Sequence, residues 1–182
     1  EMTDAETKID EFLKGKIQSY PNFPKPGIIF RDVFPIFRDP VALEMLFTKI
    51  LRHIHSTFLN SIDVIVGLDS RGFLFGPTLS MRLGCSFVPI RKKGKLPGEV
   101  VSTDYSKEYG KDGFEIQKDS VKSGDRVVVI DDLLATGGTL EAACQLLKSV
   151  GAKVQQCVVV IELDEIKGRD NVSAPVHSFF HY

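Results

Sequence analysis

The stretch Val127 to Thr139, VVVIDDLLATGGT, decides the fold class. Its first four residues, Val127 to Ile130, form an apolar β-branched run, which is typical of a strand covered on both faces. Further along, apolar residues recur at helical spacing: Leu140, Ala143, Cys144, Leu147 and Val150. Gly151 then stands where such a helix would end. A buried strand that leads into a helix predicts one unit of a parallel α/β sheet.

The loop between this strand and helix has the composition of a sugar-phosphate site. Asp131 and Asp132 end the strand, and the small residues Ala135, Thr136, Gly137, Gly138 and Thr139 open the helix. Free amides and the positive dipole end at a helix N-terminus attract anions, and glycines allow a close approach. Two carboxylates would repel a phosphate, so we interpret them as acceptors for sugar hydroxyls or as groups around a divalent ion. Phosphate, diol and metal together describe a ribose phosphate.

Apolar runs elsewhere predict the rest of the fold. Strands are expected at 62–68, 86–91, 114–117 and 157–163, and helices at 5–19, 39–58 and 73–83. Strands that alternate with helices predict an α/β fold with a doubly wound, mainly parallel sheet flanked by helices. In such sheets, ligands bind at the carboxyl ends of strands, near the point where the strand order reverses.

Two other predicted strands also end in residues suited to anions. The turn Asp69-Ser70-Arg71-Gly72-Phe73 follows the strand at 62–68. Arg91, Lys92, Lys93 and Lys95 follow the strand at 86–90. Either feature alone is common in a solvated turn. Because both begin at a strand end, they favour a site for a polyanion.

Two segments do not fit regular elements. Residues 20–40 combine many prolines with many apolar side chains, which predicts a stiff, extended segment rather than a long helix or a central strand. Residues 92–113 are rich in glycine and charge and are expected to form a long loop. Long loops in compact chains are usually functional or disordered.

Composition excludes several classes of protein. The 182 residues carry 23 basic and 24 acidic side chains, so the net charge is −1 and bulk binding to nucleic acid is not expected. Three scattered cysteines form no disulfide framework or metal motif. Neither a signal peptide nor a membrane span is apparent, so a cytoplasmic, single-domain protein (1–182) is expected. The motifs of dinucleotide folds and of P-loop kinases are absent.

The strand-end motifs carry a resemblance to a known family. Val127 to Thr139 resembles the phosphoribosyl-pyrophosphate (PRPP) motif of the type I phosphoribosyltransferases. Further segments are similar to those members of the family that use adenine: 23–32, 67–73, 90–98, 105–110 and 162–169. The matches run from Tyr20 to Arg169, most of the chain.

The resemblance implies a pentosyl-transferring glycosyltransferase of purine salvage, which moves the 5-phosphoribosyl group of PRPP to N9 of adenine and releases AMP and pyrophosphate. Asp131 and Asp132 would hold the ribose hydroxyls, and 135–139 would hold the 5′-phosphate. Asp69, Ser70 and Arg71 would form a pyrophosphate loop, often with a cis peptide in this family. Arg91 and Lys95 would also meet pyrophosphate, in the same subunit or in the partner of a homodimer.

The resemblance also gives roles to the irregular segments. Residues 20–40 would form a base-binding hood, in which Ile29 and Arg31 contact adenine together with Leu163. Residues 95–113 would form a mobile lid, with Glu108 as the catalytic acid/base and Tyr105 and Tyr109 packing the closed lid. Mg²⁺ would be bound mainly by PRPP, pyrophosphate and water, without a dedicated protein cage.

Three alternatives stay open at this point. The first is a regulator that binds PRPP or a purine without catalysis. The second is a transferase for another purine base, and the third is an oligomeric scaffold with an α/β fold. Retention of Glu108 and the absence of an extra basic surface argue against the regulator. The clustering of anion motifs at three strand ends argues against the scaffold.

Overall fold

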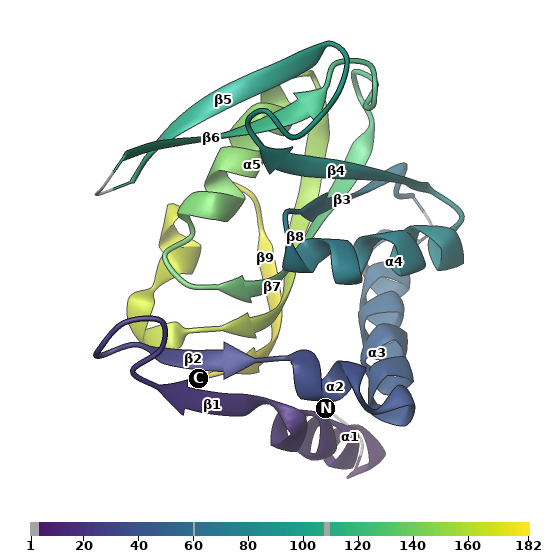
Figure 1. The fold of residues 1–182 in the computed structure, drawn as a ribbon. Coiled ribbons are helices and arrows are strands. Elements are labelled where there is room, and N and C mark those ends of the chain that lie inside the picture. Colours follow the sequence, from purple (N-terminus) through teal and green to yellow (C-terminus); the bar gives the residue numbers. More distant parts are fainter. Residues whose placement is uncertain (1–3, 60, 108–109) are drawn as a thin grey trace. The chain divides into compact units, whose positions relative to one another are not determined.

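The computed structural model describes residues 4–59, 61–107 and 110–182, with 104–107 and 110–112 described by their backbone alone (Figure 1). The chain divides into two compact units, Glu1–Thr57 and Phe58–Tyr182, each with its own secondary structure. The prediction of a single domain stays a prediction.

Unit 1 is mainly helical. It contains α1 (Asp4–Lys16), α2 (Phe34–Phe37) and α3 (Pro40–Phe58), together with an antiparallel pair of strands, β1 (Gln18–Pro21) and β2 (Ile29–Asp32). Asp39 caps α3 as predicted, because its Oδ1 accepts the amides of Val41 at 3.0 Å and Ala42 at 3.2 Å. Its other oxygen pairs with Lys16 at 2.8 Å, and this bond and the cap lower the pKa of Asp39.

The proline-rich segment 20–40 contains neither a long helix nor a central strand, as predicted. Instead it holds the end of β1, the whole β1–β2 turn, β2 itself and the short helix α2. The Phe23–Pro24 peptide is cis, and Gly27 has a φ of 86°, which favours glycine. The Gly27 amide donates to Asn22 Oδ1 at 2.9 Å and closes the turn.

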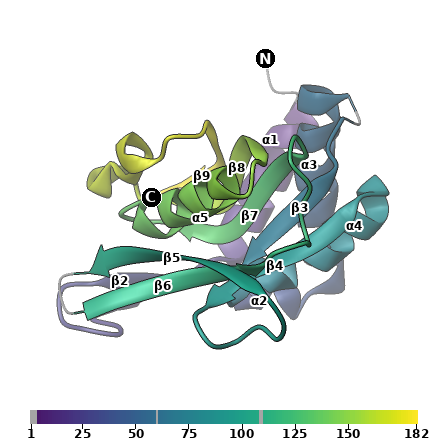
Figure 2. The same ribbon diagram turned by 90° about the horizontal axis from the view of Figure 1, so that it is seen from above.

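Unit 2 is built on a seven-stranded sheet in the order β5-β6-β4-β3-β7-β8-β9. The central strands are β3 (Val64–Leu68), β4 (Ser86–Lys92), β7 (Arg126–Leu134), β8 (Lys153–Glu162) and β9 (Val176–His181), and neighbours among them pair in parallel. Helix α4 (Gly76–Leu83) packs on β3 and β4, and α5 (Gly138–Ser149) packs on β7 and β8 (Figures 1 and 2). The predicted mainly parallel sheet flanked by helices is confirmed.

The predicted long loop at 92–113 is wrong as a description of secondary structure, whereas the strand expected at 114–117 is present. Most of the predicted loop forms a β-hairpin, with β5 (Val100–Lys107) antiparallel to β6 (Gly110–Gln117), and β6 extends the sheet beside β4 (Figure 2). Its polar composition hid the strands, because a two-stranded extension at a sheet edge does not need an apolar run. The mobility expected of this segment stays a prediction.

The core of unit 2 lies around β7 and β8. Val127 to Ile130 and Cys157 to Ile161 are fully buried, as expected for strands covered on both faces. Cys144 and Cys157 are buried in the same region, and all three cysteines are free thiols. Among the residues that the structure describes, a helix with the length and apolarity needed to span a bilayer is not found.

Asp63 joins the amino ends of three neighbouring strands, β3, β4 and β7. Its carboxylate accepts the Arg126 amide at 2.8 Å and the Arg126 side chain through Nε at 2.9 Å and Nη2 at 3.0 Å. Its backbone carbonyl accepts the amide of Ser86 at 3.1 Å. The hydrogen bonds from Arg126 lower the pKa of Asp63 to about 2. One residue therefore aligns the starts of β3, β4 and β7.

We expect Asp63→Asn to lower the melting temperature at pH 7. The folded-state pKa lies below the unfolded value, so the contribution of the ionised carboxylate is present above about pH 4 and is lost as the pH falls towards 2. Thermal unfolding of parent and variant should therefore differ at pH 7 and converge near pH 2. Asp119→Asn, at an exposed aspartate in the turn after β6, is the control. A difference that persists at pH 2 would contradict the assignment.

Candidate active site

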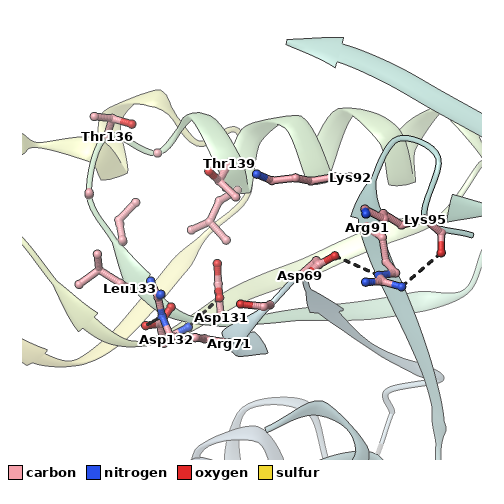
Figure 3. Close-up of a pocket in the computed structure, with 15 residues that line it drawn as sticks. Asp69, Arg71, Arg91, Lys92, Lys95, Asp131, Asp132, Leu133, Thr136 and Thr139 are labelled. Carbon is pink, nitrogen blue, oxygen red and sulfur yellow. Dashed lines mark hydrogen bonds and ion pairs between the residues drawn. The ribbon is translucent and has the colours of Figure 1, made fainter. Parts of the chain in front are cut away.

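A cavity of about 510 Å³ lies at the carboxyl ends of β3, β4 and β7 (Figure 3). It is lined by residues 69–71, 91–92, 95, 131–137 and 139–140. All of them belong to unit 2. Strands β3 and β7 are neighbours, and the chain leaves them towards opposite edges of the sheet, to β4 and to β8. This is the switch point at which doubly wound sheets bind ligands.

The predicted PRPP residues meet at this cavity. Eleven of the lining residues were expected from sequence, in two groups: the acids and small residues after β7, and residues 69–71, 91 and 95 after β3 and β4. Gly138 is the first residue of α5, beside the lining residues Gly137 and Thr139. The structure brings these side chains together, and their individual roles stay predictions.

The loop after β7 presents a helix N-terminus to the cavity. Gly137 is the N-cap of α5 with a φ of 84°, and no side chain caps the first turn. The first amides of a helix lack partners within the helix and favour negative charge. The loop therefore has the features of an anion site.

The two acids after β7 differ in their surroundings. Asp132 is almost fully buried, and its Oδ2 accepts Arg71 Nε in an ion pair. Asp131 is half-buried, and its Oδ1 accepts the Asp132 amide at 2.9 Å. Burial and the neighbouring Asp132 carboxylate raise the pKa of Asp131 well above its ordinary value. The pocket thus holds a carboxylate whose charge is poorly compensated before a ligand binds.

Arg91 and Lys95 lie at the other end of the cavity, and the Arg91 guanidinium is already oriented. Arg91 Nε donates to Asp69 Oδ2 at 3.0 Å, and its Nη1 donates to the Lys95 carbonyl at 3.2 Å (Figure 3). The Asp69–Ser70 peptide is cis, as the resemblance implied. A Cβ on Gly72 would lie 2.5 Å from the Ile130 carbonyl oxygen, so this glycine lets the turn after β3 lie against β7.

Two residues near the cations were given no individual role by the resemblance. Lys92 lines the cavity, and the run of four cations was the signal that pointed to it. Glu115, opposite Arg91 on β6, is 4% exposed and accepts the amides of Lys95 at 2.9 Å and Leu96 at 2.8 Å. Burial raises the pKa of Glu115, but the amides of Gly94, Leu96 and Lys95, together with the charge of Lys93, outweigh it and lower the pKa. No sequence signal marked Glu115, because its partner is a turn 20 residues away.

The residues predicted for adenine and for the lid are only partly described. Ile29, 50% exposed, and Arg31 lie on β2 in unit 1, whereas Leu163 follows β8 in unit 2 and donates its amide to the Leu134 carbonyl at 3.0 Å. Tyr105 lies on β5, opposite Asp112. Glu108 and Tyr109 lie outside the described residues. All of these roles stay predictions.

Among the described residues, one group of side chains has the spacing of a metal site. Glu162, Asp164 and His181 place ligand atoms within 4.8 Å of one another. Arg169 and Ser178 already donate to Glu162, and His181 Nδ1 bonds Asp164 at 2.8 Å. These partners satisfy the group without an ion, so we assign it no metal.

We expect Asp131→Asn to raise the melting temperature of the ligand-free protein. The folded-state pKa is above the unfolded value, so ionisation costs stability, and the cost grows as the pH rises through the folded-state pKa. Asparagine keeps the acceptor for the Asp132 amide but carries no charge. The gain should be largest near pH 8, about 2–4 °C for each kcal/mol, and vanish below about pH 4. Thermal unfolding with Asp119→Asn as control checks this; a lower melting temperature at pH 8 would refute it.

Comparisons with known proteins agree with this geometry. The family model described as "Phosphoribosyl transferase domain" matches residues 38–181. A relative from Homo sapiens, adenine phosphoribosyltransferase, is 50% identical over 178 residues, covering 98% of this chain and 97% of that protein. The structure of the Saccharomyces cerevisiae enzyme, complexed with an imino-altritol bisphosphate and adenine, has a TM-score of 0.92 and 46% identity, with 95% of this chain and 99% of that chain covered.

A more distant structure has the same fold. Adenine phosphoribosyl transferase from Trypanosoma brucei, in complex with AMP, pyrophosphate and ribose-5-phosphate, has a TM-score of 0.87 and 26% identity, with 99% of this chain and 82% of that chain covered. The family expected from the strand-end motifs is confirmed. The chain belongs to the phosphoribosyl transferase family and, within it, to the adenine phosphoribosyltransferases.

Proposed function

We propose that the chain transfers the 5-phosphoribosyl group of PRPP to N9 of adenine, forming AMP and releasing pyrophosphate, and that the cavity of unit 2 is where PRPP binds. The reaction follows from membership of the adenine phosphoribosyltransferases. The observation that carries the assignment of the cavity is that charged and polar groups suited to each part of PRPP line it together. Two carboxylates and a helix N-terminus lie after β7, and Arg71, Arg91 and Lys95 lie after β3 and β4.

Each part of PRPP has a chemical counterpart in this arrangement. The 5′-phosphate suits the loop at 135–139, and the ribose hydroxyls suit the carboxylates of Asp131 and Asp132. Pyrophosphate suits Asp69 to Arg71 with Arg91 and Lys95, because guanidinium and ammonium groups donate to phosphate oxygens. In Figure 3, Thr136 lies at one end of the cavity and the Arg91–Lys95 pair at the other, which is the order of groups along PRPP.

The same charges suit the chemistry. Departure of pyrophosphate from C1′ builds positive charge on the ribose, as in glycoside cleavage. Asp131 and Asp132 stabilise this charge, and Arg71, Arg91 and Lys95 stabilise the negative charge of the leaving group. The ion pairs Arg71–Asp132 and Arg91–Asp69 hold two of these cations in place before substrate binds.

Mg²⁺ is the cofactor we propose. Asp69 and Asp132 already pair with arginines, so they are poor ligands for a metal ion enclosed by protein groups. Asp131 accepts a backbone amide instead and is the better candidate to approach an ion. This fits an ion held mainly by pyrophosphate oxygens and water, with which Mg²⁺ prefers to complete its shell. When bound, the ion neutralises leaving-group charge.

The base site and the lid complete the proposal. The residues proposed for adenine are Ile29, Arg31 and Leu163, and the yeast relative's structure with adenine supports this choice of base. Glu108 is the acid/base for the purine ring, on a lid at 95–113 that keeps water from the activated sugar. Tyr105 and Tyr109 pack the closed lid.

We also propose a homodimer in the cytoplasm. Leu59, Leu74 and Met81 of unit 2 are exposed apolar side chains, 83%, 37% and 75% exposed, of the kind that a second subunit covers. Free cysteines without a disulfide framework fit a reducing compartment.

The function is tested by a pyrophosphate-release assay with Mg²⁺ and PRPP. Adenine, hypoxanthine, guanine and orotate are offered separately. Activity with adenine that exceeds the others supports the proposal, and a preference for another base would correct the specificity. Activity with none of the four would favour a regulator that binds without catalysis.

We expect the double variant Asp131→Asn, Asp132→Asn to lose PRPP affinity by roughly tenfold or more for each carboxylate, because charge-assisted hydrogen bonds to the ribose hydroxyls are lost. Calorimetric titration with PRPP measures the change, and Asp119→Asn is the control. Unchanged affinity would remove the role of these acids as acceptors for the diol.

We expect Glu108→Ala to lower turnover by about 10²–10⁴ with a much smaller change in PRPP affinity, because a general acid/base acts in the transition state. Steady-state rates with saturating adenine, and calorimetry with PRPP, separate the two effects. Glu99→Ala, at an exposed glutamate earlier in the same segment, is the control. Near-normal turnover would refute the assignment of Glu108.

A further inference from the structure

We propose that a rear brace, the segment Gly168–Ser173, aims the amides of the phosphate loop, Ala135–Thr139, into the cavity, and that Asn171 is a positioning residue for the 5′-phosphate of PRPP. The inference rests on the proposed function of the cavity. It concerns residues that do not line the cavity and that the mechanism above does not use.

The backbones of brace and loop touch at two glycines. A Cβ on Gly168 would lie 1.9 Å from the Ala135 carbonyl oxygen, and a Cβ on Gly137 would lie 2.2 Å from the Gly168 carbonyl oxygen. Side chains cannot be accommodated at either distance, so only glycine at both positions allows this approach. The contact places the brace directly behind the phosphate loop.

Two hydrogen bonds join the same segments. Asn171 Nδ2 donates to the Thr136 carbonyl at 2.9 Å. The Ser173 amide donates to Glu141 Oε2 at 2.7 Å, and Glu141 lies in the first turn of α5. The brace therefore holds both the loop and the start of the helix that follows it.

Peptide geometry turns these contacts into an orientation of the amides. The carbonyls of Ala135 and Thr136 both face the brace. In a trans peptide the carbonyl and the next amide point in opposite directions, and the cis bonds among the described residues lie elsewhere. The amides of Thr136 and Gly137 therefore point away from the brace, and both residues line the cavity. Two successive amides aimed together form an anion-binding concavity.

The brace is itself fixed to the sheet. Arg169 donates to both oxygens of Glu162, through Nε at 3.1 Å and Nη2 at 2.5 Å, and its Nη1 donates to the Val176 carbonyl at 2.6 Å. Glu162 is 5% exposed at the end of β8, and Val176 begins β9. A segment anchored at the ends of two strands can hold a neighbouring loop in one conformation.

The brace acts on one half of the cavity. Asn171 contacts the loop that carries Thr136, whereas Arg91 and Lys95 lie at the opposite end (Figure 3). Ribose 5-phosphate and pyrophosphate are therefore separate probes of the two halves. If removal of the Asn171 side chain loosens the whole protein, both probes bind more weakly. If it only misplaces the loop, the binding of ribose 5-phosphate alone is weakened.

The test is Asn171→Ala in the full chain, at an exposed residue. Calorimetry should show ribose 5-phosphate binding weakened about three- to tenfold, the value of one hydrogen bond, with pyrophosphate binding unchanged. KM for PRPP should rise by a similar factor while kcat and KM for adenine stay at parent values. The 5′-phosphate does not change during the reaction, so its binding is equal in ground and transition states. Asp170→Asn, the neighbouring exposed residue, is the control.

The outcomes are distinct. The inference is overturned if Asn171→Ala binds ribose 5-phosphate like the parent, or if both probes bind equally more weakly. In either case, AMP formation by the parent still upholds the proposed function. A parent chain that neither binds ribose 5-phosphate nor forms AMP would overturn both. Gly168→Ala supplies a second variant, since its Cβ must displace the Ala135 carbonyl. It should weaken ribose 5-phosphate binding more than Asn171→Ala does, and a smaller effect would overturn the inference.

Discussion

The parallel pairing of β3 with β7 is the constraint on which unit 2 depends. The two strands are neighbours, but the chain continues from β3 to β4 on one side and from β7 to β8 on the other. Because the two strands are parallel, the loops after both leave the sheet at the same end. Asp63 and Arg126 align the opposite ends, and Gly72 allows the turn after β3 to lie against Ile130. The cavity exists because these two strands end side by side.

The charged side chains of the cavity are of two kinds: some form ion pairs, and one carboxylate is poorly compensated. Arg71 and Arg91 are paired with Asp132 and Asp69, so the cations stay oriented without a ligand. Asp131 is less well compensated, and burial beside Asp132 raises its pKa. In the proposed mechanism Asp131 stabilises positive charge on the ribose, and its own ionisation costs stability in the protein without ligand. The ion pairs therefore orient the cations, and the poorly compensated Asp131 lies beside one of these pairs.

Much of this was predictable because it is local. Apolar runs marked β3, β4, β7 and β8, and the residues after three of these strands marked the anion site, since parallel strands end at a common edge. The end of β6 was expected as a strand at 114–117, whereas β5 and the start of β6 were missed because they are mostly polar. Glu115 was missed because it acts on the amides of Lys95 and Leu96, which belong to another part of the chain. Hydrogen bonds between distant segments leave no periodic trace in a sequence.

The sequence by itself determined the fold class, the family and the set of charged groups at the strand ends, because periodicity and motif spacing are properties of neighbouring residues. Only the tertiary structure decided which acid pairs with which base, which carboxylate is left with a raised pKa, and that Gly168 and Asn171 lie behind the phosphate loop. The physical reason is that pairing, burial and peptide orientation depend on contacts between residues far apart in the chain, such as Asn171 with Thr136, 35 residues apart, and Arg71 with Asp132, 61 residues apart, and folding alone sets these contacts.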